Sequence, residues 1–417
     1  MTPNAPFLDI LAALLFAAAL LHGFAAPRLL RLSLRFPRHA GLWRLIGQIE
    51  IAFALWALVL LLAIALVAGP APALAHAGSY RYTEPLFVFV VMVIAASRPV
   101  LQAVLGAIDA LAGALPARQA VARVWLGLAA VPMLGSLITG PAAMTIAALT
   151  LAPLVFRPDM PERLKYLALG VLFVNVSLGG MLTTLAPPAR LAAAAGTWDE
   201  GLRLASFGWR AVLAMLANAT LAAWALRAHL RTPREPAALR EVPLPLMLAH
   251  LAFLAATVLL CRQAPAFLAV FLLYLGFTRA SRRHQDPPLL RQALLAALFV
   301  AGLIVLGAGQ QWWLQPALSA LSPRLLFFGA AALSSLADNT TLACLAALVA
   351  GISEEARHSL LTGTLAGGGL TVFANGPNPG GVALLRHGFA RASVGAPRLL
   401  LGAALPTLVA LAALGLV

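Results

Sequence analysis

The chain has 417 residues, of which 62% are hydrophobic and 10% are charged, and its mean hydropathy of +0.92 excludes a soluble globular domain. A formal net charge of +15 would favour nucleic-acid binding in a soluble protein. Here the arginines concentrate between apolar runs, where they mark the cytoplasmic side of a membrane protein, so no nucleic-acid partner is predicted.

Apolar runs near or above the roughly 18–20 residues needed to cross about 30 Å of hydrocarbon recur along the chain. The first run has no basic residues before it, which favours a retained span over a signal peptide. The sequence therefore predicts an all-α polytopic membrane protein. Its ten expected spans lie near 7–26, 45–68, 86–108, 165–186, 206–227, 243–260, 265–279, 288–309, 357–374 and 396–416.

Two further apolar segments, about 120–156 and 322–352, are interrupted halfway by "GSLITGPA" and "SSLADNTT". A segment of roughly 35 residues with a central break is typical of a re-entrant hairpin. Ten spans and two hairpins place the arginine-rich loops on one side, the cytoplasm, and both termini in the periplasm. This polarity predicts the inner membrane of a bacterium.

Arg98 is the exception to this topology, because it lies inside the expected span 86–108, beside Pro99. Either that span is two short helices, or Arg98 faces protein rather than lipid.

The two halves of the chain resemble each other. "GGMLTTLA" at 179–186 and "GGGLTVFA" at 367–374 share five of eight residues at an offset of 188, and the two hairpin breaks align at an offset of 199. Five crossings per half would invert the second half relative to the first. We therefore expect an inverted repeat at 1–228, a cytoplasmic linker at 229–242 and a second inverted repeat at 243–417.

The stretch "ANGPNPGG" at 374–381 cannot be helical. An unpaired backbone group in hydrocarbon costs several kcal/mol, so such a stretch is expected to line a cavity or to hold something polar. The other break carries a carboxylate, Asp338, whose burial in a membrane costs at least about 2.5–3.5 kcal/mol, which favours a functional role. The glycines expected to free the backbone at the helix break are Gly367, Gly368, Gly369, Gly376 and Gly380.

In the first half, the corresponding candidates are Ser136, Thr139, Asn175 and Ser177. An isolated Ser or Thr in a span more often bonds a carbonyl of its own helix than a ligand. "SLITGPAA" has no acid or amide, which favours a mechanism with one carboxylate. Glu50 and Asp109 lie near predicted span ends, and their roles are left open.

"SLADNTTLA" and "GTLAGGGLTVFANGPNPGG" resemble the sodium/proton antiporter family of the ion transporter superfamily. The resemblance implies two inverted repeats, each with a re-entrant hairpin and a discontinuous helix, and often a homodimer. It also implies one mid-membrane ion site, formed by Ser335, Asp338, Asn339, Thr340, Thr371, Asn375 and Asn378.

The function expected from this resemblance is secondary active transport, not enzymatic catalysis. Na⁺ and H⁺ would be the transported ions, with Na⁺ as the metal ion bound at Asp338 in alternation with a proton. No cofactor is expected, because the chain has no Walker-type motif for ATP and its two cysteines, Cys261 and Cys344, are far apart. The alternative is a Na⁺- or H⁺-coupled carrier of an organic or inorganic anion bound at half-helix N-termini. Neither break contains the basic residue that such a carrier usually adds.

Overall fold

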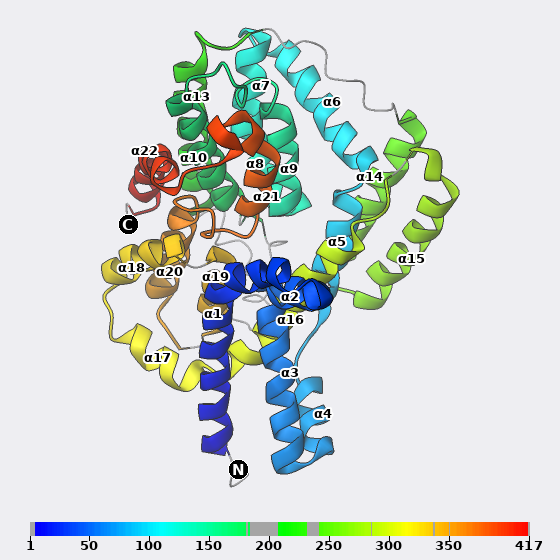
Figure 1. Cartoon of the computed structure of the whole chain (residues 1–417), viewed down its shortest axis with the longest axis vertical. Helices are drawn as coiled ribbons and strands as arrows, with labels where there is room; N and C mark the ends of the chain where they lie inside the picture. The colour runs from blue at the N-terminus through cyan, green and yellow to red at the C-terminus, as the bar shows by residue number, and fades with distance from the viewer. Residues whose placement is uncertain are drawn as a thin grey trace.

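The computed structural model describes residues 5–180, 182–183, 207–231, 242–284, 286–336, 338–349 and 351–415, and their regular structure is helical throughout (Figure 1). The helices of the first half are α1 (Ala5–Arg35), α2 (Ala40–Ile46), α3 (Ile49–Ala68), α4 (Pro70–Gly78), α5 (Thr83–Ala95), α6 (Arg98–Ala114), α7 (Gln119–Leu128), α8 (Ala130–Ile138), α9 (Gly140–Leu151), α10 (Glu162–Gly179) and α13 (Trp209–Leu226). Those of the second half are α14 (Leu244–Leu259), α15 (Ala264–Ala280), α16 (Leu290–Ala308), α17 (Gln311–Ser319), α18 (Pro323–Leu336), α19 (Asn339–Leu348), α20 (Glu354–Gly367), α21 (Asn378–Leu385) and α22 (Ala396–Gly415). Single 3-10 turns lie at Pro37–His39, Arg282–His284, Arg386–Gly388 and Ala390–Ala392.

Several of these helices are long and apolar enough to cross a membrane, which confirms the predicted all-α polytopic class. Within the described residues there are five of them, Ile51–Ala68, Gln119–Ile138, Trp209–Leu226, Leu290–Ala308 and Ala396–Gly415, or six if the bent pair α5 and α6 is one span. Four of the five coincide with predicted spans. The total of ten spans stays a prediction.

The segment expected as span 86–108 consists of two helices, which is one of the two alternatives that Arg98 raised. Two helices, α5 and α6, meet there at an angle of 66°. Pro99 lies in the first turn of α6, where its missing N–H costs nothing, but it cannot continue a helix from α5. Arg98 opens α6, and its Nε donates to Asp286 Oδ2 at 2.9 Å. Both sequence alternatives therefore hold, because the span is broken and Arg98 faces a carboxylate.

Three short helices, α2, α4 and α17, were not expected, and they lie between the predicted spans and hairpins. Helices α4 and α17 stand at the same end of the molecule as the N-terminus in Figure 1.

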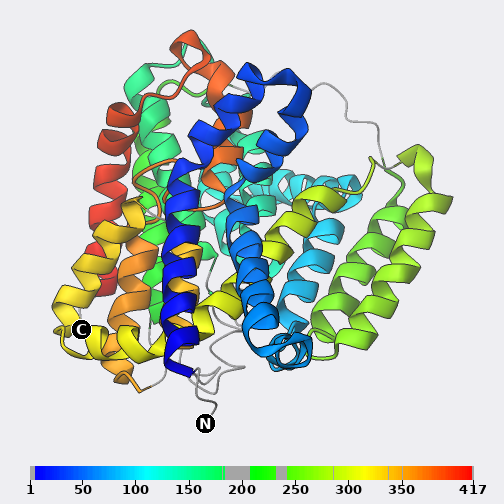
Figure 2. The ribbon, with the colours of Figure 1, turned by 60° about the horizontal axis from the view of Figure 1, so that its bottom comes forward.

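Helices that are distant in sequence pack side by side. Helix α16 packs against α3 and α5, and α10 packs against α8, α13 and α22. Figure 2 shows that the axes of most helices are roughly aligned. Small residues permit the closest crossings. A Cβ on Gly302 would lie 2.4 Å from the backbone of Ala54, and one on Gly170 would lie 2.6 Å from that of Ala403.

Both halves contain a helical turn-back and a helix that stops early. Helices α8 and α9 pack against each other around Thr139, whereas α18 and α19 both pack on α20. Helix α10 ends at Gly179 and α20 ends at Gly367, 188 positions later. Since 14 residues of α20 rise only about 21 Å, the predicted span 357–374 is a shorter helix than expected. The chain becomes helical again in α21 at Asn378, so the expectation that 374–381 is not helical is wrong for 378–381, because Pro379 is tolerated in the first turn of a helix. The matching stretch after α10, and most of the expected linker 229–242, lie outside the described residues.

Candidate functional site

A cavity of about 500 Å³ lies where both turn-backs and both early-ending helices meet. One side is an apolar wall from α5 and α16, which includes Phe87, Met92, Leu295 and Phe299. The opposite side consists of the two helix tips and the break between α20 and α21. The polar residues that line the cavity are Gln48, Ser136, Thr139, Thr145, Ser177, Gln292, Asp338, Asn339, Thr340 and Asn375.

Asp338 is the N-cap of α19. Its Oδ2 accepts hydrogen bonds from the Thr341 N–H at 2.9 Å and from Thr341 Oγ1 at 3.1 Å. A cap of this kind typically stabilises a helix by about 1 kcal/mol. Among the described residues that line the cavity, Asp338 is the one with a formal charge. The site therefore offers one carboxylate among neutral oxygens.

Asn339 joins the tip of α19 to both halves of the chain. Its Nδ2 donates to Ser177 Oγ at 2.8 Å, and Ser177 Oγ in turn donates to the Leu365 carbonyl at 2.6 Å. Its backbone N–H donates to the Ala374 carbonyl at 2.9 Å. Asn339 is 5% exposed and Ser177 is 2% exposed, so this chain of bonds is shielded from competing water. It fixes Asp338 relative to α10 and to the break.

Three predicted site residues lie behind the cavity rather than on its surface. Thr371 Oγ1 donates to the Ser335 carbonyl at 2.7 Å, and Ser335 Oγ donates within its own helix to the Ala332 carbonyl at 2.6 Å. Asn378 is fully buried, and its Nδ2 donates to the carbonyls of Gly368 at 3.1 Å and Thr371 at 3.0 Å. The contacts of Thr371 and Asn378 pair backbone carbonyls at the break that lack helical partners, whereas the Ser335 bond lies within α18.

The glycines of the break differ in what surrounds them. A Cβ on Gly367 would meet the Ala331 carbonyl at 2.1 Å, one on Gly368 would meet Ser177 Oγ at 2.3 Å, and one on Gly369 would meet the Val174 N at 2.6 Å. A Cβ on Gly376 would lie 3.6 Å from Asp338 Oδ1, and a Cβ on Gly380 would meet open space. None of the five has a positive φ. For Gly367 to Gly369, close approach of neighbouring atoms is therefore the physical requirement.

Thr139 occupies the position in the first half that Asp338 occupies in the second, 199 residues later, and it likewise precedes the first residue of a helix. Its φ of +88° is rare for a residue with a Cβ and is a strained conformation. Its Oγ1 is buried and has no hydrogen-bond partner within the part of the chain that the structure describes. Thr139 thus lines the cavity at the tip of α9 with a hydroxyl that is not committed to a hydrogen bond within the described residues.

Asn175, the fourth first-half candidate with Ser136, Thr139 and Ser177, does not line the cavity. Its Nδ2 donates to the Leu128 carbonyl at 2.7 Å and to the Met215 carbonyl at 3.1 Å. Pro132 has no N–H to pair with Leu128, which explains why a side chain is needed there. Asn175 Oδ1 accepts from Asn218 Nδ2 at 3.2 Å.

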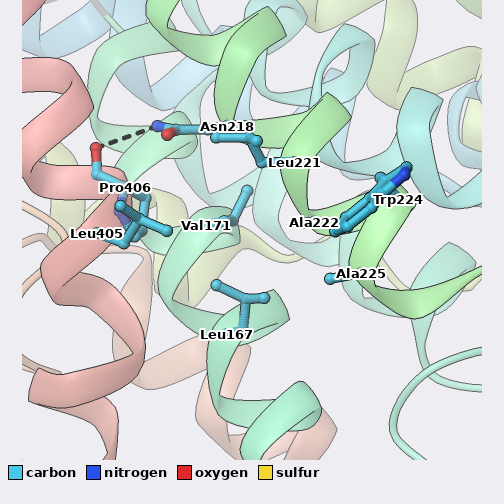
Figure 3. A pocket seen from close by; sticks show the side chains of 9 residues that line it. All are labelled: Leu167, Val171, Asn218, Leu221, Ala222, Trp224, Ala225, Leu405 and Pro406. Carbon is cyan, nitrogen blue, oxygen red and sulfur yellow. Dashed lines mark hydrogen bonds between the residues drawn. The ribbon is translucent and has the colours of Figure 1, made fainter.

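Asn218 also donates to the Pro406 carbonyl at 3.2 Å, across the gap between α13 and α22 (Figure 3). The hollow beside this bond has a volume of about 170 Å³, and its other lining side chains are apolar. Its one amide is already paired, so this hollow is not the candidate ion site.

Of the two carboxylates left open by the sequence, the structure describes the side chain of one. Asp109 Oδ1 is 2.9 Å from Arg123 Nε on the neighbouring α7. Glu50 is in the first turn of α3, and its side chain falls outside the described residues. Asp109 does not line the cavity.

Sequence reasoning missed the apolar wall, the exposed Phe373 in the break, and the two glutamines. Gln48 and Gln292 each stand near the start of an apolar run, which was the available signal. Gln48 Oε1 is buried without a hydrogen-bond partner in the described ranges.

Comparison with known proteins gives one family. Residues 7–417 match the profile of the family described as "Putative Na+/H+ antiporter". The crystal structure of the YdaH transporter of Alcanivorax borkumensis is similar at 15% sequence identity and a TM-score of 0.41, covering 88% of this chain and 95% of that one. No curated protein matches the chain significantly.

Proposed function

We propose that this chain, which belongs to the Putative Na⁺/H⁺ antiporter family over residues 7–417, exchanges Na⁺ for H⁺ across a membrane by alternating access. Family membership makes it an integral membrane transporter rather than an enzyme. The coupling residue in this proposal is Asp338, which binds either a proton or Na⁺ but not both.

The observation that carries the proposal is the position of Asp338 in the cavity. Asp338 lines the cavity together with Asn339, Thr340 and Asn375, whose side chains bear oxygen. Carboxylate and carbonyl oxygens are the ligands that hard cations prefer in proteins. The same carboxylate can accept a proton, and mutual exclusion of the two ions at one carboxylate is sufficient for coupled antiport.

The inverted-repeat architecture, with repeats at 1–228 and 243–417 joined by a cytoplasmic linker at 229–242, is part of the proposal. It is supported by matched offsets: α10 and α20 end 188 positions apart, and the helix caps Thr139 and Asp338 lie 199 positions apart. The two segments 120–156 and 322–352 are then re-entrant, and rocking of one repeat against the other would open the site to each side in turn.

We further propose that the protein lies in a bacterial inner membrane as a homodimer, with both termini in the periplasm. The orientation rests on the arginine-rich loops, which the positive-inside rule assigns to the cytoplasm.

No observation favours the anion carrier. The described residues that line the cavity include neither Lys nor Arg, and an anion there would stand beside Asp338 without a countercharge.

The test is proton movement in proteoliposomes after a Na⁺ pulse, compared for the wild-type protein, Asp338→Asn and Asp109→Asn. Asn caps helices about as well as Asp, so Asp338→Asn should fold with α19 intact. It should nevertheless lose at least about 95% of Na⁺-dependent proton movement, because the amide cannot titrate.

Asp109→Asn is the matched control, because it removes a carboxylate outside the cavity, and it should exchange at the wild-type rate. Near-normal exchange by Asp338→Asn would show that a different group couples the two ions.

A further inference from the structure

The cavity is much larger than a single Na⁺ needs. A water molecule takes up about 30 Å³ in the liquid, and cavities that hold small organic ligands span about 300–1,000 Å³. At about 500 Å³, this cavity falls in the second range. An ion site alone therefore does not explain the size and the lining of the cavity.

The walls suit an apolar body. Phe87 and Met92 of α5 face the cavity together with Leu295 and Phe299 of α16. Phe87 packs edge-to-face on Phe267 with 5.9 Å between centroids, and Phe299 packs on Phe53 with 5.3 Å between centroids. The two rings are thus fixed from behind. Ligand sites of this size are typically apolar, with a few polar groups that orient the ligand.

We propose that the cavity also binds and transports a monovalent organic cation with an aromatic or bulky aliphatic body, in exchange for protons. Its charge would lie beside Asp338, and its body would lie against the α5 and α16 wall. This inference rests on the proposed function, since it uses Asp338 as the group that a proton and a cation share.

The residues that line the cavity indicate the sign of the ligand's charge. Asp338 is the one charged residue among the described lining residues, so a cation gains a countercharge and an anion does not. Three phenylalanines, Phe87, Phe299 and Phe373, also line the cavity, and aromatic faces attract quaternary ammonium groups. Phe373 belongs to the break itself and is 54% exposed, whereas Ala374 and Asn375, which directly follow it, are buried. A ring left open beside the carboxylate is what an organic cation would cover.

The test uses benzyltrimethylammonium, which carries a permanent charge and therefore cannot move protons by itself. Proteoliposomes with an internal pH dye receive a pulse of this cation, of tetramethylammonium, of benzenesulfonate or of Na⁺. We expect benzyltrimethylammonium to drive proton movement and to raise the half-saturating Na⁺ concentration by competition. Tetramethylammonium, which lacks the aromatic body, should be at least tenfold less effective, and benzenesulfonate, an aromatic anion that stays charged and so cannot carry protons across the bilayer by itself, should have no effect.

Phe299→Leu should raise half-saturation for benzyltrimethylammonium about tenfold more than for Na⁺, because it removes a ring from the wall. Phe328→Leu is the control, because Phe328 lies on α18 outside the cavity and is 59% exposed. It should behave as the wild type with both cations.

The outcomes separate the two proposals. If Na⁺ exchange is normal but benzyltrimethylammonium neither moves protons nor competes, the inference is wrong and the antiport proposal stands. If benzenesulfonate moves protons, the charge argument is wrong. If no cation moves protons in the wild-type protein, the antiport proposal fails and the inference fails with it.

Discussion

At the scale of single residues, Gly368 shows how closely the two halves of the chain meet. A Cβ at this position would lie 2.3 Å from Ser177 Oγ and 2.6 Å from Asn339 Nδ2. It would therefore displace the hydrogen bond that fixes Asn339, and with it the residue that precedes it, Asp338.

We predict that Gly368→Ala lowers the maximal rate of Na⁺-dependent proton movement at least about tenfold and destabilises the protein by about 1–3 kcal/mol, as overpacking of a dense core does. Gly380→Ala is the control, since its Cβ would meet open space. It should keep both the wild-type rate and the wild-type melting temperature in detergent. Equal damage from both changes would mean that flexibility of the break, rather than packing at Gly368, is what matters.

The residues of the site were predictable to different degrees. Asp338 and Asn339 could be found because polar side chains in an apolar run carry a high cost and need a reason. Asn378 and Thr371 belong to the same motif, but their side chains pair the backbone of the break instead of facing the cavity. The spacing of these residues in the sequence cannot distinguish the two roles. Outside a helix, the position of a residue along the chain no longer determines the direction in which its side chain points. Gln48 is a lone amide near the start of an apolar run, and that position alone does not indicate that it lines the cavity.

At the scale of elements, the turn between α8 and α9 stores strain at Thr139. The φ of +88° and ψ of 148° fall in a region that is used almost only by glycine. Such strain costs about 1–3 kcal/mol and persists where the surrounding structure imposes it.

We predict that Thr139→Gly stabilises the protein by about 1 kcal/mol, because relief of strain exceeds the extra entropy of glycine in the unfolded chain. Thr139→Ala should not stabilise it, since Ala keeps the Cβ and loses only the hydroxyl. Thermal unfolding of both purified variants measures the difference. A stabilised Ala variant would indicate that the buried hydroxyl, not the backbone, carries the cost.

The start of α10 is held to the segment after α21 by a buried lysine. Lys165 is 1% exposed, and its Nζ donates to the Gly388 carbonyl at 2.6 Å and lies 2.7 Å from Glu162 Oε1. Burial alone would raise the pKa of Glu162. The hydrogen bonds from Lys165 and from the Ala390 N–H, with the charges of Lys165 and Arg398, hold that pKa below its usual value.

A depressed pKa in the folded state means that the Glu162 contribution to stability is present above the unfolded pKa of about 4.3 and is lost as the pH falls through the lower folded value. We therefore predict that Glu162→Gln lowers the melting temperature at pH 7 and pH 5, and that the difference from the wild type disappears below about pH 4. Melting curves over this range measure it. A difference that vanished already between pH 7 and pH 5 would contradict the assignment.

Elements of about 18 residues or more were predictable because hydrophobic length is what a bilayer selects. The boundaries of α3, α13, α16 and α22 agree with predicted spans to within a few residues. Helices α4 and α17 were not predictable in this way, since each has nine residues and lies in a connecting segment. The break before Arg98 was visible as a charge beside a proline, but its 66° angle depends on tertiary packing.

At the scale of the whole molecule, the sequence predicts the class of fold, but it does not predict which helices pack against each other. The contact of α10 with α22 joins segments more than 200 positions apart, and it depends on Gly170 and Gly402, which are ordinary glycines in an Ala- and Leu-rich chain. Two motifs that can be aligned are enough to predict a repeat, but their similarity does not show how each repeat is oriented in the membrane. The orientation depends on whether each hairpin returns to the side of the membrane from which it entered.

That question has a direct test, because Gln119–Ile138 is 20 residues long and apolar enough to cross the bilayer by itself. If 120–156 is re-entrant, single cysteines at Ala117 and Pro158, placed in a chain without Cys261 and Cys344, should both react with an impermeant maleimide from the cytoplasm. Cysteines at Leu321 and Glu354, which flank the second hairpin, should both react from the periplasm. All four residues are exposed, so failure to label would not arise from burial. Everted vesicles and intact cells supply the two sides. Labelling of 117 and 158 from opposite faces would make the first segment a full crossing, and the halves would then no longer be inverted relative to each other, although Asp338 would keep its place in the cavity.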